Sequence, residues 1–155
     1  MKGKSILLLV AILLALACTS TASAAPASKV PFSATIVVGT TGDPERSWVD
    51  EEGMHIRGWV ISGSISGDIN GEVALIANLN IDFSGSGGEQ VKGVITDGGL
   101  EIYRASFDIT ISTGGMTGTF VFIGVGSCKG THVTGTITAG AGGAVLTGTK
   151  LTTHP

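Results

Sequence analysis

The residues best suited to chemistry in this chain lie close together, on either side of an acidic turn from Asp50 to Gly53. Two aromatic side chains, one imidazole and one guanidinium flank this turn: Trp48, His55, Arg57 and Trp59. Aromatic planes beside a guanidinium and an imidazole can hold a sugar, an aromatic acid or a carboxylate. If the segments before and after the turn pair, the last three of these residues share one face of a strand and the first lies nearby. The four residues are the predicted ligand-binding site.

A second interpretation of the same segment is an exposed hairpin tip with ordinary surface charges and two core tryptophans. His55 would act as a general base only with a carboxylate or a substrate within hydrogen-bond distance. The other histidines, His132 and His154, lack the spacing of a zinc site, and the carboxylates form no predicted pair of the glycosidase kind. Nucleotide-binding and nucleophile-elbow motifs are also missing. The sequence therefore predicts no catalytic residue, no metal site and no cofactor.

The elements that would position these residues are predicted by a five-residue unit, apolar-x-Gly-x-apolar. Residues two apart on a strand share a face, so each unit places a notch without a side chain between two apolar residues on the buried side. Glycine weakens a flat strand but suits strands that coil sharply or approach one another closely. The pattern predicts an all-β, single antiparallel up-and-down β-barrel of about eight strands. The units are centred on Gly58, Gly63, Gly71, Gly93, Gly118, Gly135 and Gly148.

Alternating apolar residues and glycine-rich breaks predict many short strands with tight connections. The odd-numbered positions from Ile61 to Phe83 stay small or apolar, so a three-residue loop, Ser66 to Asp68, is expected to join two strands that bury the same parity. Gly58 has the opposite parity, which predicts a bulge near Val60 and Ile61. Ser84 to Glu89 is expected to be a loop. The predicted strands are 33–38, 46–49, 54–65, 69–83, 90–96, 100–112, 116–126, 131–138 and 144–151.

The N-terminal segment resembles an export signal, because two lysines precede a short apolar run that ends in small residues. We expect residues 1–24 to be a signal peptide, 25–32 a flexible linker and 33–155 the barrel domain. The alternative is a lipoprotein signal with Cys18 as the lipid attachment site. Both interpretations place the folded part outside the cytoplasm, secreted or tethered to the envelope.

Composition narrows the class of partner. Without residues 1–24, seven Lys and Arg stand against twelve Asp and Glu, which gives a net charge of −5. This balance argues against nucleic acid, because phosphates require a basic face. The mature chain is expected to have no transmembrane span, since an outer-membrane barrel needs aromatic girdles and an apolar outer band. Cys128 would then be the single cysteine, so no internal disulfide can form.

A family resemblance rests on the run from Gly124 to Ile137, in which a Gly-x-Gly turn precedes a Gly-x-x-x-x-Gly strand. This run resembles the last hairpins of allene-oxide-cyclase-like and dirigent-like barrels, a calycin-type group. The resemblance implies an eight-stranded antiparallel barrel, often a homo-oligomer, whose interior holds a small apolar molecule. In plant relatives such a barrel guides cyclisation or radical coupling. None of the family's catalytic residues matches a position of this chain.

These observations predict a noncatalytic binding module that holds a small, largely apolar ligand in the barrel mouth. The first alternative is an enzyme of the cyclase or isomerase kind, with His55 or Arg57 at the mouth. The second is a structural or matrix protein that assembles through strand edges or threonine-rich faces.

Overall fold

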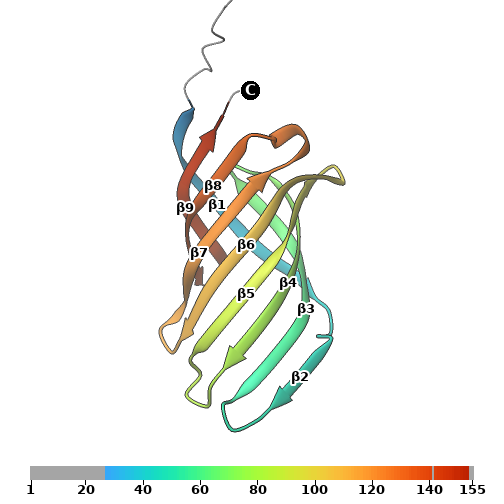
Figure 1. Ribbon diagram of the computed structural model, residues 1–155, viewed down its shortest axis with the longest axis vertical. Coiled ribbons are helices and arrows are strands. Elements are labelled where there is room, and N and C mark those ends of the chain that lie inside the picture. Colours follow the sequence, from blue (N-terminus) through green and yellow to red (C-terminus); the bar gives the residue numbers. More distant parts are fainter. Residues whose placement is uncertain (1–26, 141, 154–155) are drawn as a thin grey trace, which may run out of the picture.

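The computed structural model describes residues 27–140 and 142–153 (Figure 1). They form nine β-strands and one 3₁₀ turn, Gly126–Cys128, so the predicted all-β class is confirmed. The strands are β1 Ser28–Thr41, β2 Arg46–Val49, β3 Met54–Gly67, β4 Gly71–Ile81, β5 Gly87–Asp97, β6 Leu100–Ser112, β7 Gly115–Gly124, β8 Thr131–Gly140 and β9 Gly143–Thr152.

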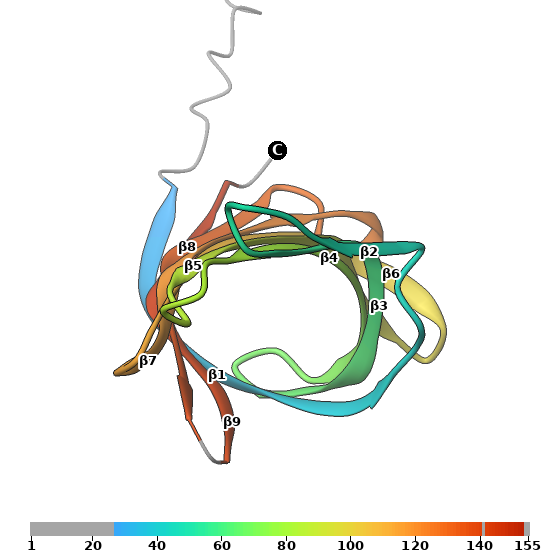
Figure 2. The same ribbon diagram turned by 90° about the horizontal axis from the view of Figure 1, so that it is seen from below.

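The strands form a closed antiparallel barrel (Figure 2). From β2 to β9, each strand pairs with the next, and β1 closes the ring. The first part of β1 pairs with β9, through residues 28–36, and its second part pairs with β3, through residues 34–41. The short strand β2 pairs with the start of β3, beyond the part that β1 covers. Eight strands therefore build the predicted barrel, and β2 is an additional strand at one end.

The two ends of the barrel carry different structures. One end, here called the mouth end, carries β2 and the connections 42–45, 50–53, 82–86 and 113–114, and it lies at the bottom of Figure 1. The opposite end carries residue 28, residue 152 and the 3₁₀ turn.

The repeated glycines lie where strands approach one another closely. Six of the seven predicted centres face the barrel interior, in register with inward residues of the neighbouring strands. Gly135 shows why: a Cβ at this position would lie 2.8 Å from Cε1 of Phe120 and would also clash with the backbone of β9. The notches therefore bring backbones together and make room for large side chains opposite.

The seventh centre, Gly58, corrects one prediction. The pairing of β3 with β4 shifts between Ile56 and Trp59, so the bulge lies at Gly58 and not near Val60 and Ile61. Gly58 has a φ of +65°, a left-handed conformation that favours glycine. The bulge adds one residue to β3. Even-numbered residues such as Ile56 face inward before it, and odd-numbered residues face inward from Trp59 on.

Most of the other strands also have bounds that differ from the prediction by a few residues, and three of these differences change the interpretation. β1 begins at Ser28, so residues 28–32 belong to the first strand and not to a linker. The predicted hairpin between β3 and β4 has three loop residues, 66–68, but its last observed pair is Ile65 with Gly71, so five residues, 66–70, lie between the paired positions. β5 begins at Gly87, so Glu89 lies in a strand and not in a loop. Hydrogen-bonded pairing with a neighbouring strand extends β1 and β5 past their apolar core, whereas β4 is shorter than predicted and begins at Gly71.

The predicted signal peptide, the candidate lipid attachment site Cys18 and His154 lie outside the described residues. Within the described part of the chain, no helix is long and apolar enough to cross a lipid bilayer.

Candidate functional site

The half of the barrel away from the mouth is filled by five aromatic side chains, here called the aromatic plug. Their ring centroids lie 4.7 to 6.4 Å apart in tilted and edge-on pairs, the geometry that aromatic rings prefer. Each ring is at most 5% exposed. The members of the plug are Phe32, Tyr103, Phe107, Phe120 and Phe122.

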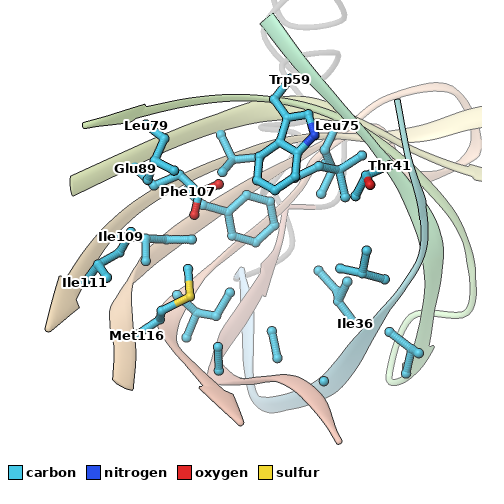
Figure 3. A pocket seen from close by; sticks show the side chains of 18 of the residues that line it. Ile36, Thr41, Trp59, Leu75, Leu79, Glu89, Phe107, Ile109, Ile111 and Met116 are labelled. Carbon is cyan, nitrogen blue, oxygen red and sulfur yellow. The ribbon is translucent and has the colours of Figure 1, made fainter. Parts of the chain in front are cut away.

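The mouth half of the barrel is hollow. It contains a cavity of about 650 Å³, whose wall consists mainly of aliphatic side chains (Figure 3). Phe107, a member of the aromatic plug, also lines the cavity and belongs to its floor. At the mouth end the lining residues Ile81, Ile111 and Met116 are partly exposed. A cavity of this size and composition is typical of a site for a small apolar molecule.

Among the side chains that line this cavity, Glu89 is the one that ionises. It is 6% exposed and points inward between Leu79 of β4 and Ile109 of β6, with which it pairs. Figure 3 shows its carboxyl group facing the same space as the ring of Phe107. Within residues 27–140 and 142–153, this carboxyl group takes part in no ion pair. Its oxygens are open to the cavity, since no fully buried polar atom of these residues lacks a hydrogen-bond partner. Burial raises the pKa of Glu89, because the charged form loses hydration.

Of the four predicted site residues, only Trp59 lines the cavity. Its indole lies at the edge of the cavity (Figure 3), and its Nε1–H donates a hydrogen bond of 3.0 Å to the carbonyl oxygen of Gly42. The prediction placed Trp59 on the same face as His55 and Arg57, and this is wrong. The bulge at Gly58 turns Trp59 inward and leaves the other two outward.

Trp48, His55 and Arg57 form a separate cluster on the outer face at the mouth end. As predicted, β2 pairs back on β3, which sets Trp48 opposite His55. The two rings stack with centroids 4.9 Å apart, and the guanidinium of Arg57 lies 5.2 Å from the indole centroid. Arg46 covers the same indole at 4.6 Å. These residues border a polar cleft of about 550 Å³ that is distinct from the barrel cavity.

Two hydrogen bonds favour the protonated form of His55. Its Nδ1 lies 2.8 Å from Oδ1 of Asn80, an oxygen that also accepts a 2.7 Å bond from Arg57. Its Nε2 lies 2.9 Å from a carboxylate oxygen of Asp50. Both ring nitrogens therefore face acceptors, and both must donate.

The electrostatics of this cluster follow from those hydrogen bonds. The pKa of His55 is raised above its usual value of 6.5, first by the bond to Asn80 and then by the bond to Asp50. The same contact lowers the pKa of Asp50, with help from the backbone N–H of Glu52. Since these hydrogen bonds join Asp50 of the turn to His55 of β3, and His55 to Asn80 of β4, the cluster fastens β2 and its turn to the barrel.

Sequence reasoning missed Glu89, although the signal was present. Glu89 shares its parity with Val91, Gly93 and Ile95, which all face inward. A strand extended by one residue toward the N-terminus would have placed a carboxyl group in the core. The prediction instead assigned Glu89 to the loop that begins at Ser84.

No group of three or more His, Cys, Asp or Glu in the described part of the chain could hold a metal ion. No protein-family model matches the chain, and no curated protein or solved structure matches it significantly. The resemblance to allene-oxide-cyclase-like and dirigent-like barrels therefore stays a prediction, and the site is interpreted from its own geometry.

Proposed function

We propose that this protein is a noncatalytic binding module that holds a small, largely apolar molecule in the mouth half of its barrel. The observation that carries the proposal is the cavity of about 650 Å³ with its aliphatic wall. A folded chain normally fills its interior, because empty apolar space forfeits packing contacts. A bound apolar ligand would restore these contacts at the site.

The rest of the barrel supports this proposal. The aromatic plug occupies the far half with closely packed rings, so a ligand would enter from the mouth end and stop at Phe107. Secretion, which the N-terminal sequence predicts, would place the module where it meets ligands outside the cell.

The test is binding of Nile red, a neutral apolar dye whose emission rises in apolar surroundings. The blocking variant is Ala139→Trp, because Ala139 lines the cavity near its edge and a larger side chain there would occupy the space. The matched control is Thr138→Trp, which adds the same ring on the exposed outer face of the same strand. We expect saturable binding to the wild type and the control, and at least about tenfold weaker binding to the blocked variant. Equal binding to both variants would place the dye elsewhere and contradict the proposal.

A second candidate is an enzyme of the cyclase or isomerase kind, and Glu89 is the observation that favours it. A buried carboxyl group with a raised pKa is suited to general acid catalysis near neutral pH. This role would fall to Glu89 and not to His55 or Arg57, which lie on the outer face.

Mass spectrometry of the molecule that copurifies from the natural source would separate the two candidates. A binding module would carry the same molecule in the wild type and in Glu89→Gln. An enzyme would carry product in the wild type and unreacted substrate in the variant.

Assembly through strand edges has less support, because the pairing of β1 with β3 closes the ring. In the described part of the chain, the additional strand β2 is four residues long and begins with a charged arginine, a combination that discourages edge pairing.

A further inference from the structure

Glu89 is an unfavourable residue to place in an aliphatic wall. Its side chain is 6% exposed, and neither ion pair of the described residues includes its carboxyl group. No fully buried polar atom of these residues lacks a hydrogen-bond partner, so the unpaired oxygens of Glu89 stay open to the cavity. An ionised carboxylate that faces an apolar cavity loses much of its hydration. A ligand group of opposite charge would compensate for this loss, and removing one partner of such a pair is strongly unfavourable.

The depth of Glu89 fits a molecule with two distinct ends. Along β5, Glu89 is nearer the mouth end and Val91 is the next inward residue. Val91 and its partner Phe107 both line the deeper part of the cavity. A ligand with its polar group at Glu89 can therefore place an apolar body below, toward the aromatic plug.

The mouth itself carries a second, independent feature, which is an excess of negative charge. Six acidic residues lie in the three connections that carry charge there: Asp43, Glu45, Asp50, Glu51, Glu52 and Asp82. The two arginines at this end, Arg46 and Arg57, both lie over the ring of Trp48 on the outer face. Arg57 also donates to two backbone carbonyl oxygens and to Asn80, so it is not available to Glu89. An acidic opening attracts cations and repels anions.

We propose that the ligand is an apolar amine that binds as a cation, with its ammonium group on Glu89 and its hydrocarbon body against the aliphatic wall. This inference rests on the proposed function, because it requires the cavity to take up a ligand. A fatty acid of the same length would meet like charge at the mouth and again at Glu89. A neutral alcohol would find the same wall but no opposite charge.

The test compares three molecules with the same ten-carbon chain as competitors of Nile red at pH 7: decylamine, 1-decanol and decanoic acid. We expect decylamine to displace the dye at about tenfold lower concentration than 1-decanol, because only the ammonium group can form a charge-assisted hydrogen bond with Glu89. Decanoic acid should be the weakest of the three. In Glu89→Gln, decylamine should lose its advantage while 1-decanol stays unchanged.

The matched control is Glu72→Gln, which removes one exposed carboxylate on the outer face of β4 and leaves both the mouth and the cavity wall intact. It should keep the preference for decylamine. Equal displacement by decylamine and 1-decanol in the wild type, or a preference that survives Glu89→Gln, would overturn the amine inference and leave the binding module standing. Failure of Nile red itself to bind would overturn the proposed function instead.

Discussion

The two halves of this barrel share one wall and differ in what they contain. Strands β5, β6 and β7 run through both halves with the same inward and outward alternation. In the half away from the mouth, the inward positions carry the five rings of the aromatic plug. In the mouth half they carry aliphatic side chains and Glu89, and about 650 Å³ stays open.

Within a single strand, some inward residues therefore contribute mainly to stability and others mainly to ligand binding. Rings that contact one another on several sides supply much of the packing of the fold, whereas side chains that border a cavity have fewer neighbours to lose. Substitutions in the plug should therefore act on the free energy of unfolding. Substitutions in the mouth half should act mainly on the ligand.

The largest effect is expected for Phe122→Ala in the aromatic plug. Phe122 is fully buried and its ring contacts four other rings. Its removal should lower the free energy of unfolding by about 3–5 kcal/mol, measured by chemical denaturation.

A matched pair of isoleucines sharpens the comparison. Ile95 is fully buried opposite Tyr103, whereas Ile111 borders the cavity at the mouth. Ile95→Ala should cost about 2–5 kcal/mol, the usual range for a core residue, and Ile111→Ala clearly less. Equal losses would show that the mouth half is as tightly packed as the plug.

The next effect has the opposite sign, because Glu89→Leu should stabilise the protein. Replacing an unpartnered buried carboxyl group with an apolar side chain should gain about 1–3 kcal/mol near neutral pH. The raised pKa of Glu89 means that the neutral form suits the folded state. The wild-type protein therefore keeps its full stability at low pH, where Glu89 is protonated, and becomes less stable as the pH rises through the pKa of Glu89. Unfolding measured from pH 4 to pH 8 should show a gain that grows with pH, and a constant or negative difference would contradict the account.

A smaller loss is expected for Gly58→Ala at the bulge that turns Trp59 into the mouth half. The left-handed φ of +65° should cost a residue with a Cβ about 1–2 kcal/mol. Ser64→Ala, on an exposed position of the same strand, is the control and should change the free energy of unfolding very little. Because Trp59 lines the cavity, its fluorescence should change when Nile red binds. If this change disappears in Gly58→Ala but persists in Ser64→Ala, the bulge positions Trp59 at the site.

The smallest effect is expected outside the barrel, at the His55 cluster. The pKa of His55 is raised, so the interaction of protonated His55 with β2 and its turn is present below that pKa and is lost as the pH rises through it. Asp50 has a lowered pKa, so the contribution of its carboxylate to the same interaction is lost only in acid. In a Trp59→Phe background, emission of Trp48 should rise above the pKa of His55, when the stacked imidazolium loses its charge and leaves the ring. His55→Gln should remove this step, and an unchanged step would mean that another group causes it.

The sequence predicted the barrel well because its signals are local and repeated. Alternating apolar residues and inward glycines such as Gly118 and Gly135 recur on strand after strand, so the all-β class and a barrel of about eight strands followed. The site depended on single residues. One positive φ at Gly58 moved Trp59 to the other face, and hydrogen-bonded pairing with β4 and β6 drew Glu89 into the wall. Neither a cavity nor a single buried charge leaves a periodic pattern.

The claim that the mouth half is hollow and apolar while the other half is filled can be tested most directly by crystallography under xenon pressure. Xenon occupies open apolar space and needs no charge. The account predicts xenon in the mouth half, between Phe107, Val91 and Ile109, and none among the rings of the aromatic plug. Absence of xenon from the mouth half, or xenon sites around Phe122 and Tyr103, would contradict it.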